Sequence, residues 1–195
     1  MPKLGMEPIR REALVRATIE EIGQAGSLDV TVSKIAKRAG VSSALAHHYF
    51  GGKEQIFLAA MRYILKGYGK DVQQALNGVR HPMARLEAII GASFSERQFK
   101  QDVVSAWLNF YVQSQNNPET QRLLSIYHRR LRSNLLANLR PLIGARSEDV
   151  AETLAAMIDG LYIRQALGAA PLNSAFAKQQ VVRCLMLEIQ VGDPT

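Results

Sequence analysis

Five polar or aromatic side chains lie within eight positions of the sequence, at Ser42, Ser43, His47, His48 and Tyr49. Hydroxyl and imidazole groups at this density can bind a metal ion, form a nucleophile–base pair, or hydrogen-bond to a polar surface. Neighbouring histidines on a helix point about 100° apart, so they do not converge on one metal ion as histidines four residues apart can. The segment from residue 32 to 50 contains no carboxylate or thiol to complete a metal site. We therefore expect no metal here.

Nucleophilic catalysis is the second possibility. Ser43 and His47 lie one helical turn apart and could hydrogen-bond to each other. Such a pair also needs an orienting acid and an oxyanion hole, and the sequence suggests candidates for neither. Elsewhere the chain has no glycine-rich phosphate loop and no zinc-ligand spacing. We therefore expect a protein that is not an enzyme and has no cofactor, which leaves contact with a polar surface.

Two short predicted helices position these side chains. Apolar residues at helical spacing run from Val32 to Ala39, Gly40 interrupts them, and a second short helix follows from about Ser43 to Tyr49. Two short helices joined by a glycine-containing turn are the signature of a helix-turn-helix, whose second helix reads base edges in the major groove of DNA. A helical hairpin inside an all-α core has the same spacing. A buried "HHYF" segment, however, would leave several polar atoms without partners.

The predicted DNA-contacting residues fall into two groups. The second helix should point short or planar side chains outward: Ser43, Ala44, His47, His48 and Tyr49. Hydroxyl and ammonium groups at helix N-termini can bind phosphates. The residues predicted to do so are Thr31, Ser33, Ser42 and Lys53. The second helix has no arginine or asparagine for bidentate base readout, so specificity should depend on thymine methyls, single hydrogen bonds and DNA shape. An N-terminal arm with Lys3, Arg10 and Arg11 should add phosphate or minor-groove contacts.

Composition and charge narrow the class of protein. Of the 195 residues, 47% are hydrophobic and 21% charged, as in ordinary globular proteins, and the net charge of +7 makes a polyanion a candidate partner. The single cysteine, Cys184, excludes an internal disulfide and fits a reducing compartment. No signal peptide and no apolar run near the roughly 20 residues of a membrane span are found. We expect a cytoplasmic protein. We also expect the basic run at residues 128–132 to be a solvated helix face.

Helical periodicity continues through almost the whole chain and predicts an all-α fold of about nine helices. We expect a helix-turn-helix DNA-binding domain at residues 1–52, followed by an effector-binding and dimerisation bundle at residues 53–195. The first helix of the bundle should start at Lys53 and exceed 30 Å. The seventh helix should end at Pro141, and Ser147 should cap the eighth.

The last two predicted helices are apolar around much of their circumference. They contain "VAETLAAMIDGLYIRQALGAA" and then Phe176, Leu185, Met186 and Ile189. A helix that is apolar on several sides must be buried on several sides. Because one recognition helix reads too few base pairs to locate a gene, we expect these helices to form a homodimer that spans two half-sites. A monomer whose core encloses both helices is the alternative.

The segment "TVSKIAKRAGVSSALAHHYFGGKEQIFLAAM", residues 31–61, resembles the N-terminal module of TetR-family repressors. The segments "MPKLGMEPIRREALVRAT", "AWLNFY", "RRLRSNL" and "IDGLYIRQAL" are similar to the BetI-type members, choline-responsive repressors of glycine betaine biosynthesis genes. The resemblance covers almost the whole chain. It implies a TetR-like fold, operator DNA as partner, bases contacted by Ser43, Ala44 and His47, and a dimer formed by the last two helices. Phosphates would then be contacted chiefly by Ser42, His48, Tyr49 and Lys53.

The resemblance also implies choline or a related small cation as effector. Aromatic faces hold a quaternary ammonium through cation–π attraction of roughly 0.5–2 kcal/mol, balanced by a carboxylate. The candidate cage is Trp107, Phe110, Tyr111, Asp159 and Tyr162. Core packing is the alternative for each aromatic residue. Three alternative functions stay open: a TetR-family repressor of another pathway with another effector, an all-α enzyme, and a helical adaptor.

Overall fold

A computed structural model of the chain describes residues 5–168, 171 and 173–190. This part of the chain folds into α-helices and one short 3-10 helix, with no strand, which confirms the all-α prediction. The elements are α1 (Met6–Ala25), α2 (Val32–Arg38), α3 (Ser43–Phe50), α4 (Lys53–Ala75), α5 (Pro82–Ser93), α6 (Gln101–Ser114), α7 (Pro118–Ile143), η1 (Gly144–Arg146), α8 (Ser147–Leu167) and α9 (Ser174–Gln190). Lys3 of the predicted arm lies outside the described residues.

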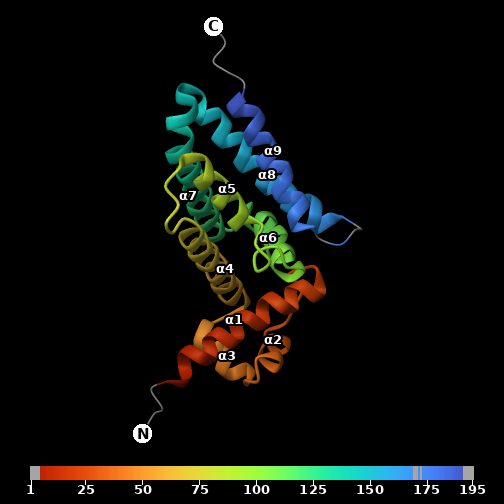
Figure 1. Cartoon of the computed structure of the whole chain (residues 1–195). Helices are drawn as coiled ribbons and strands as arrows, with labels where there is room; N and C mark the ends of the chain where they lie inside the picture. Colours follow the sequence, from red (N-terminus) through yellow and green to blue (C-terminus); the bar gives the residue numbers. More distant parts are fainter. Residues whose placement is uncertain (1–4, 169–170, 172, 191–195) are drawn as a thin grey trace.

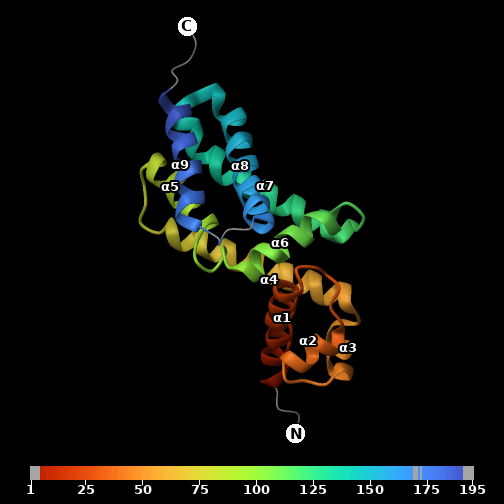
Figure 2. The ribbon, with the colours of Figure 1, turned by 90° about the vertical axis from the view of Figure 1, so that its right-hand side faces the viewer.

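The helices form a small N-terminal cluster and a larger bundle (Figures 1 and 2). The cluster consists of α1, α2 and α3, and the bundle of α5 to α9. α4 begins beside α3 and runs into the bundle, so it links the two parts. None of the helices in the described part of the chain is both long and apolar enough to cross a bilayer.

The predicted caps of the two short helices are confirmed. Thr31 Oγ1 accepts a hydrogen bond of 3.2 Å from the backbone N–H of Lys34, and Ser42 Oγ accepts one of the same length from Leu45. Gly40 has φ 69°, a left-handed conformation that glycine adopts without steric cost. These local features fix where α2 ends and α3 begins. The sequence had placed the cap of α9 at residue 173 or 174, and the structure shows that Asn173 is the cap.

Two predicted helix ends are wrong. α7 continues through Pro141 to Ile143, because a proline in the last turn removes only one backbone hydrogen bond and leaves the rest of the helix intact. Ser147 does not cap α8 from outside. Its side chain is buried, it is the first residue of the helix, and the 3-10 turn η1 leads directly into it. The chain thus reverses between α7 and α8 through η1.

α1 and α6 pack closely where the N-terminal cluster meets the bundle. Gly23 of α1 lies against Asp102 of α6, and a Cβ atom on Gly23 would be only 2.6 Å from the Asp102 Cα. Real Cβ atoms do not approach backbone atoms so closely, so a side chain here would push the two helices apart. Gly23 therefore determines how closely the N-terminal cluster packs against the bundle.

Replacing Gly23 by alanine should lower the free energy of unfolding by about 1–3 kcal/mol, the usual cost of overpacking. Urea denaturation measures the change. Gly69→Ala is the matched control, because Gly69 lies in α4 with open space around it, and there alanine should be neutral or stabilising by up to about 1 kcal/mol. Equal stability of the two variants would contradict the close-contact explanation.

Candidate DNA-binding surface and effector cavity

A small apolar core holds α2 and α3 at a fixed angle. Ile35 and Ala36 of α2 and Ala46 of α3 are buried, and Val41 in the turn is partly buried against them. The remaining side of α3 faces away from the protein. Ala44, His47 and His48 are exposed there, and Ser43 is half-buried. The structure thus brings the predicted base-contacting residues together on one outward surface.

His47 forms a hydrogen bond that differs from the one the sequence suggested. Its Nδ1 lies 3.0 Å from the backbone oxygen of Gly51, one turn further on, rather than bonding to Ser43. A carbonyl oxygen can only accept, so Nδ1 carries the proton, and in the neutral ring Nε2 is left as an acceptor. His47 therefore presents an acceptor nitrogen on an exposed side chain. In the described ranges, no group of three or more His, Cys, Asp or Glu residues could hold a metal ion.

Tyr49 is positioned by α1. The Arg11 guanidinium lies 4.9 Å from the centre of the Tyr49 ring, and Arg11 Nη1 donates a hydrogen bond of 2.6 Å to the Tyr49 backbone oxygen. Arg11 also pairs with Glu7 at 2.7 Å. Arg11 was expected to contact DNA as part of the arm, whereas the structure shows it bound to the end of α3. Tyr49 is half-buried as a result, with its ring beside that of His48.

The predicted phosphate-binding residues are all exposed at or near helix N-termini: Thr31, Ser33, Ser42 and Lys53. The Thr31 and Ser42 hydroxyls use an oxygen lone pair for capping, so each retains its proton for donation. Two exposed cations on α2, Lys34 and Lys37, add to this surface and were missed from the sequence. Arg38 is different, because it forms ion pairs with Glu20 and Glu21.

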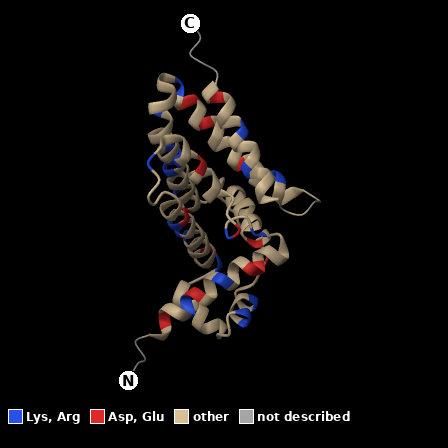
Figure 3. Cartoon of the chain, viewed as in Figure 1, with Lys and Arg blue, Asp and Glu red and all other residues tan. Residues whose placement is uncertain are grey.

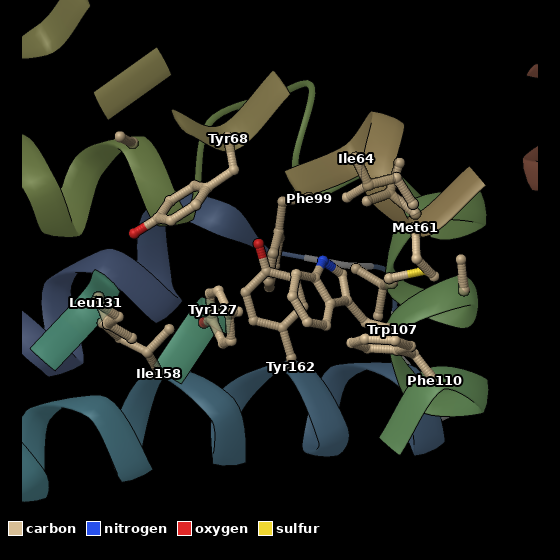
Figure 4. Close-up of a cluster of buried hydrophobic side chains, with 14 of the residues drawn as sticks. Met61, Ile64, Tyr68, Phe99, Trp107, Phe110, Tyr127, Leu131, Ile158 and Tyr162 are labelled. Carbon is tan, nitrogen blue, oxygen red and sulfur yellow. The ribbon is translucent and has the colours of Figure 1, made fainter. Parts of the chain in front are cut away.

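Inside the bundle, aromatic rings from four helices meet around a small cavity (Figure 4). The indole of Trp107 lies 4.7 Å from the ring of Tyr127, 5.7 Å from Tyr111 and 6.2 Å from Tyr162, measured between centroids. The cavity residues are Tyr68 of α4, Ser93 of α5, Gln98 of the segment between α5 and α6, Trp107 and Tyr111 of α6, Tyr127 of α7 and Tyr162 of α8. We call this set the aromatic cavity.

Asp159 is hydrogen-bonded to two of these tyrosines. Its Oδ1 accepts hydrogen bonds from the Tyr111 hydroxyl at 2.9 Å and the Tyr127 hydroxyl at 3.1 Å. Burial, and then the Asp159 charge, raise the pKa values of both tyrosines, so the hydroxyls stay protonated and donate. Asp159 Oδ2 lies 3.1 Å from His128 Nε2, and this hydrogen bond raises the pKa of His128. Three donors therefore surround one carboxylate beside the cavity.

The structure brings together four of the five predicted cage residues. Phe110 is the exception: it is fully buried, lies on the far side of Trp107 from Tyr127, and packs on Phe57 at 6.4 Å (Figure 4). Tyr68 and Tyr127 line the cavity but were not predicted to. Both belong to apolar helix faces, where periodicity alone indicates core packing.

The aromatic cavity is closed. Its volume is about 10 Å³, which is room for no more than a single water molecule. The rings fill the space themselves, with Trp107 packed against four of its aromatic neighbours. A larger ligand can enter only if some of these rings separate, and because they belong to α4, α6, α7 and α8, their separation would involve several helices at once.

A third surface lies on α8 and α9, where several large apolar side chains are exposed by 36–71%. They are Ile163 and Leu167 of α8 and Phe176, Met186 and Leu187 of α9. Only Ala177, Val181 and Leu185 of α9 are buried among its described side chains. The core of the chain therefore does not enclose both helices, contrary to the monomer alternative. Large apolar side chains exposed together on two neighbouring helices are typical of an interaction site.

Comparison with known proteins identifies the family of the chain. Residues 14–60 match the family "Bacterial regulatory proteins, tetR family", and residues 82–189 match "BetI-type transcriptional repressor, C-terminal". The HTH-type transcriptional regulator BetI of Brucella anthropi is 54% identical over 178 residues, which are 91% of this chain and 92% of that protein. The regulator of the same name from Agrobacterium fabrum is 52% identical, over 91% of this chain and 86% of its own length.

Solved structures share the fold. A transcriptional regulator from Rhodococcus superposes with a TM-score of 0.82 at 22% identity, over 95% of this chain and 98% of its own. A putative transcriptional regulator from Saccharomonospora viridis was solved in complex with choline. It superposes with a TM-score of 0.80 at 22% identity, over 90% of this chain and 95% of its own. The sequence relatives are named as regulators, and the chain is accordingly a DNA-binding regulator rather than an enzyme. The chain belongs to the TetR family of bacterial regulatory proteins, as a member with a BetI-type C-terminal domain.

Proposed function

We propose that the chain acts as a homodimeric repressor of choline-to-glycine-betaine genes, binding operator DNA through α3 and responding to choline in the aromatic cavity. The observation that carries the DNA-binding role is the outward face of α3, where Ala44, His47 and His48 are exposed with no apolar surface covering them. Residues 1–52 would form the DNA-binding domain and residues 53–195 the effector and dimerisation domain. The site of action is the cytoplasm, which contains the bacterial chromosome.

Each residue on α3 can make a particular kind of contact with DNA. The His47 Nε2 acceptor suits an amino group of adenine or cytosine in the major groove, and the Ala44 methyl suits a thymine methyl. Ser43 adds a hydroxyl that can donate or accept. The flanking groups bind the phosphates that set the register: Thr31, Ser33, Ser42, His48, Tyr49 and Lys53. Base readout of this kind is modest, so DNA shape should contribute to specificity.

The exposed apolar side chains of α8 and α9 support a dimer. Two copies of this pair of helices would cover each other's apolar surface as a four-helix interface. A two-fold axis there would place two copies of α3 at half-sites about 34 Å apart, or at a multiple of that distance. The dimer thereby doubles the number of base pairs that are read.

Choline fits the chemistry of the aromatic cavity. Its quaternary ammonium has no N–H to donate, so aromatic faces and the nearby Asp159 carboxylate are suitable partners. The Saccharomonospora viridis regulator, which shares the fold, was solved in complex with choline, and this supports choline as the kind of ligand. Because the cavity is closed, choline must part rings carried by α4 and three other helices. α4 begins at Lys53, so its displacement would alter the spacing of the two recognition helices.

A gel shift with the DNA upstream of the gene tests the proposed function. We expect sequence-specific binding that weakens steeply as salt is raised, since each phosphate contact releases counterions. Choline should weaken operator binding by about 5- to 150-fold, the range of a 1–3 kcal/mol coupling. Sedimentation of the same protein should show a dimer. Binding that does not depend on the DNA sequence would contradict the repressor function. Binding that choline leaves unchanged would contradict choline as the effector.

Choline affinity should rise with pH because His128 and choline compete for Asp159. Below its raised pKa, His128 is positively charged and already neutralises the carboxylate. The charged or titratable groups around it are Asp159 and Glu152 of α8, Tyr111 of α6 and Tyr127 of α7. As pH rises through the His128 pKa, above about 6.5, the competing charge is lost. The stabilising His128–Asp159 ion pair is present below that range and weakens within it.

Calorimetric titration with choline between about pH 6 and pH 8.5 measures this effect. We expect affinity to increase about two- to fivefold, since the competing pair is partly exposed. His128→Gln should bind choline with little pH dependence over the same range. If the variant kept the full pH dependence of choline affinity, a group other than His128 would be its cause.

A further inference from the structure

An open groove runs along the bundle between α4 and α7, outside the aromatic cavity. Its volume is about 1040 Å³. Partly buried apolar side chains form its floor: Leu65 of α4, Leu76 directly after α4, and Leu123 and Ile126 of α7. Tyr68 and Tyr127 also line it, and these two rings belong to the wall of the aromatic cavity as well. The groove is therefore a separate space that shares one wall with the cavity.

The groove has a strongly basic rim. Five cations line it: Arg62, Lys66 and Lys70 of α4, and Arg129 and Arg130 of α7. No Asp or Glu is among the residues that line the groove. None of the five belongs to an ion pair within the described part of the chain, whereas Arg38, Arg97 and Arg132 elsewhere each pair with an acid. Figure 3 marks the Lys and Arg residues along these helices.

These two features together point to a ligand with two ends. Five like charges around one groove repel one another, and the apolar floor faces water; each arrangement is unfavourable when the groove is empty. An apolar chain would cover the floor, and an anionic head would neutralise the rim. We propose that the α4/α7 groove is a second ligand site, for an amphipathic anion with an acyl or alkyl chain and a carboxylate or phosphate head.

DNA is a less suitable occupant of the same groove. Phosphate backbone would satisfy the rim but leave the apolar floor uncovered. The first groove residue on α4, Arg62, also lies nine positions beyond Lys53, or roughly 13 Å along the helix from the DNA-facing end. A small amphipathic molecule accounts for both the floor and the rim.

The shared wall couples the groove to the cavity. Tyr68 and Tyr127 pack edge to face with their ring centroids 6.0 Å apart, between the two spaces. A chain lying on the groove floor would occupy the volume into which these rings could swing. The bound anion would then hold the aromatic cavity closed and oppose choline. This coupling rests on the proposed choline site, whereas the groove as a binding site does not.

Calorimetry with three ligands of equal chain length tests the proposal on the full chain. Decanoate and decyl phosphate, each below its micelle concentration, present a carboxylate and a phosphate, and decyl maltoside presents a neutral head. We expect at least one anion to bind with one site per chain and about tenfold more tightly than the maltoside. Whichever anion binds better identifies the head group as carboxylate or phosphate ester. The proposal would be overturned if neither anion bound, or if the neutral maltoside bound as tightly as the anions.

Charge reversal locates the site. Lys66→Glu combined with Arg130→Glu should weaken anion binding about tenfold or more. The matched control is Lys100→Glu with Arg122→Glu, because both residues are exposed, lie outside the groove and give the same change in net charge. Thermal melts of both variants check folding. Unchanged anion affinity in the groove variant would overturn the proposal, and a loss of operator binding alone would assign the groove to DNA.

Discussion

Replacing Ala44 by glutamate is expected to abolish operator binding while leaving the fold intact. Ala44 is exposed on α3 and does not belong to the hydrophobic core. It is the second residue of the helix, where a carboxylate interacts favourably with the helix dipole, so the change should not lower stability. Against DNA, however, the new charge faces phosphates, and like-charge contacts cost several kcal/mol. Operator affinity should fall about 100-fold or more.

Fluorescence anisotropy with labelled operator at constant salt measures the effect of Ala44→Glu. Ala137→Glu is the control, since Ala137 is an exposed helical alanine of α7, remote from α3, and undergoes the same chemical change. That control should bind DNA almost as the unmodified protein does, because a single distant charge is screened by salt. If Ala44→Glu bound as tightly as its control, α3 would not be the recognition helix.

Local chemistry made the DNA-binding end predictable from the sequence. Thr31 and Ser42 cap helices through atoms three residues away, and Gly40 allows the turn by itself. These features depend on a few neighbouring residues. The Arg11 contact with Tyr49 joins positions 38 apart, so no local pattern indicates it. The same applies to position 23, where only glycine fits because Asp102 of another helix packs against it.

The residues around the aromatic cavity were predicted only in part, again because the sequence pattern is local. An aromatic residue on an apolar helix face can point to the core or to a cavity, and periodicity is the same for both. Trp107 and Phe110 are neighbours on α6, yet only Trp107 lines the cavity, because Phe57 of α4 covers Phe110. Asp159 was predicted for a different reason, because a carboxylate is needed to balance the charge of a quaternary ammonium. The structure shows that it accepts hydrogen bonds from Tyr111 and Tyr127.

Replacing Asp159 by asparagine should remove the response to choline and leave operator binding unchanged in its absence. Asparagine has nearly the same shape and keeps one oxygen that can accept from a tyrosine hydroxyl, so the rings should remain packed. The negative charge that balances the quaternary ammonium is lost. Removing one partner of a buried charge pair costs about 2–5 kcal/mol, so choline affinity should fall about 30-fold or more.

Glu152→Gln provides the control for Asp159→Asn. Glu152 lies on the same helix, is exposed, and its substitution removes the same charge without touching Tyr111 or Tyr127. Titration calorimetry with choline and gel shifts with and without choline should separate the two variants, with only Asp159→Asn resistant to release from DNA. Release at the unmodified protein's choline concentration would show that Asp159 is not the counter-ion. Because Asp159 is on α8, such an outcome would leave the assignment of α3 to DNA untouched and would direct the search for the effector to another carboxylate.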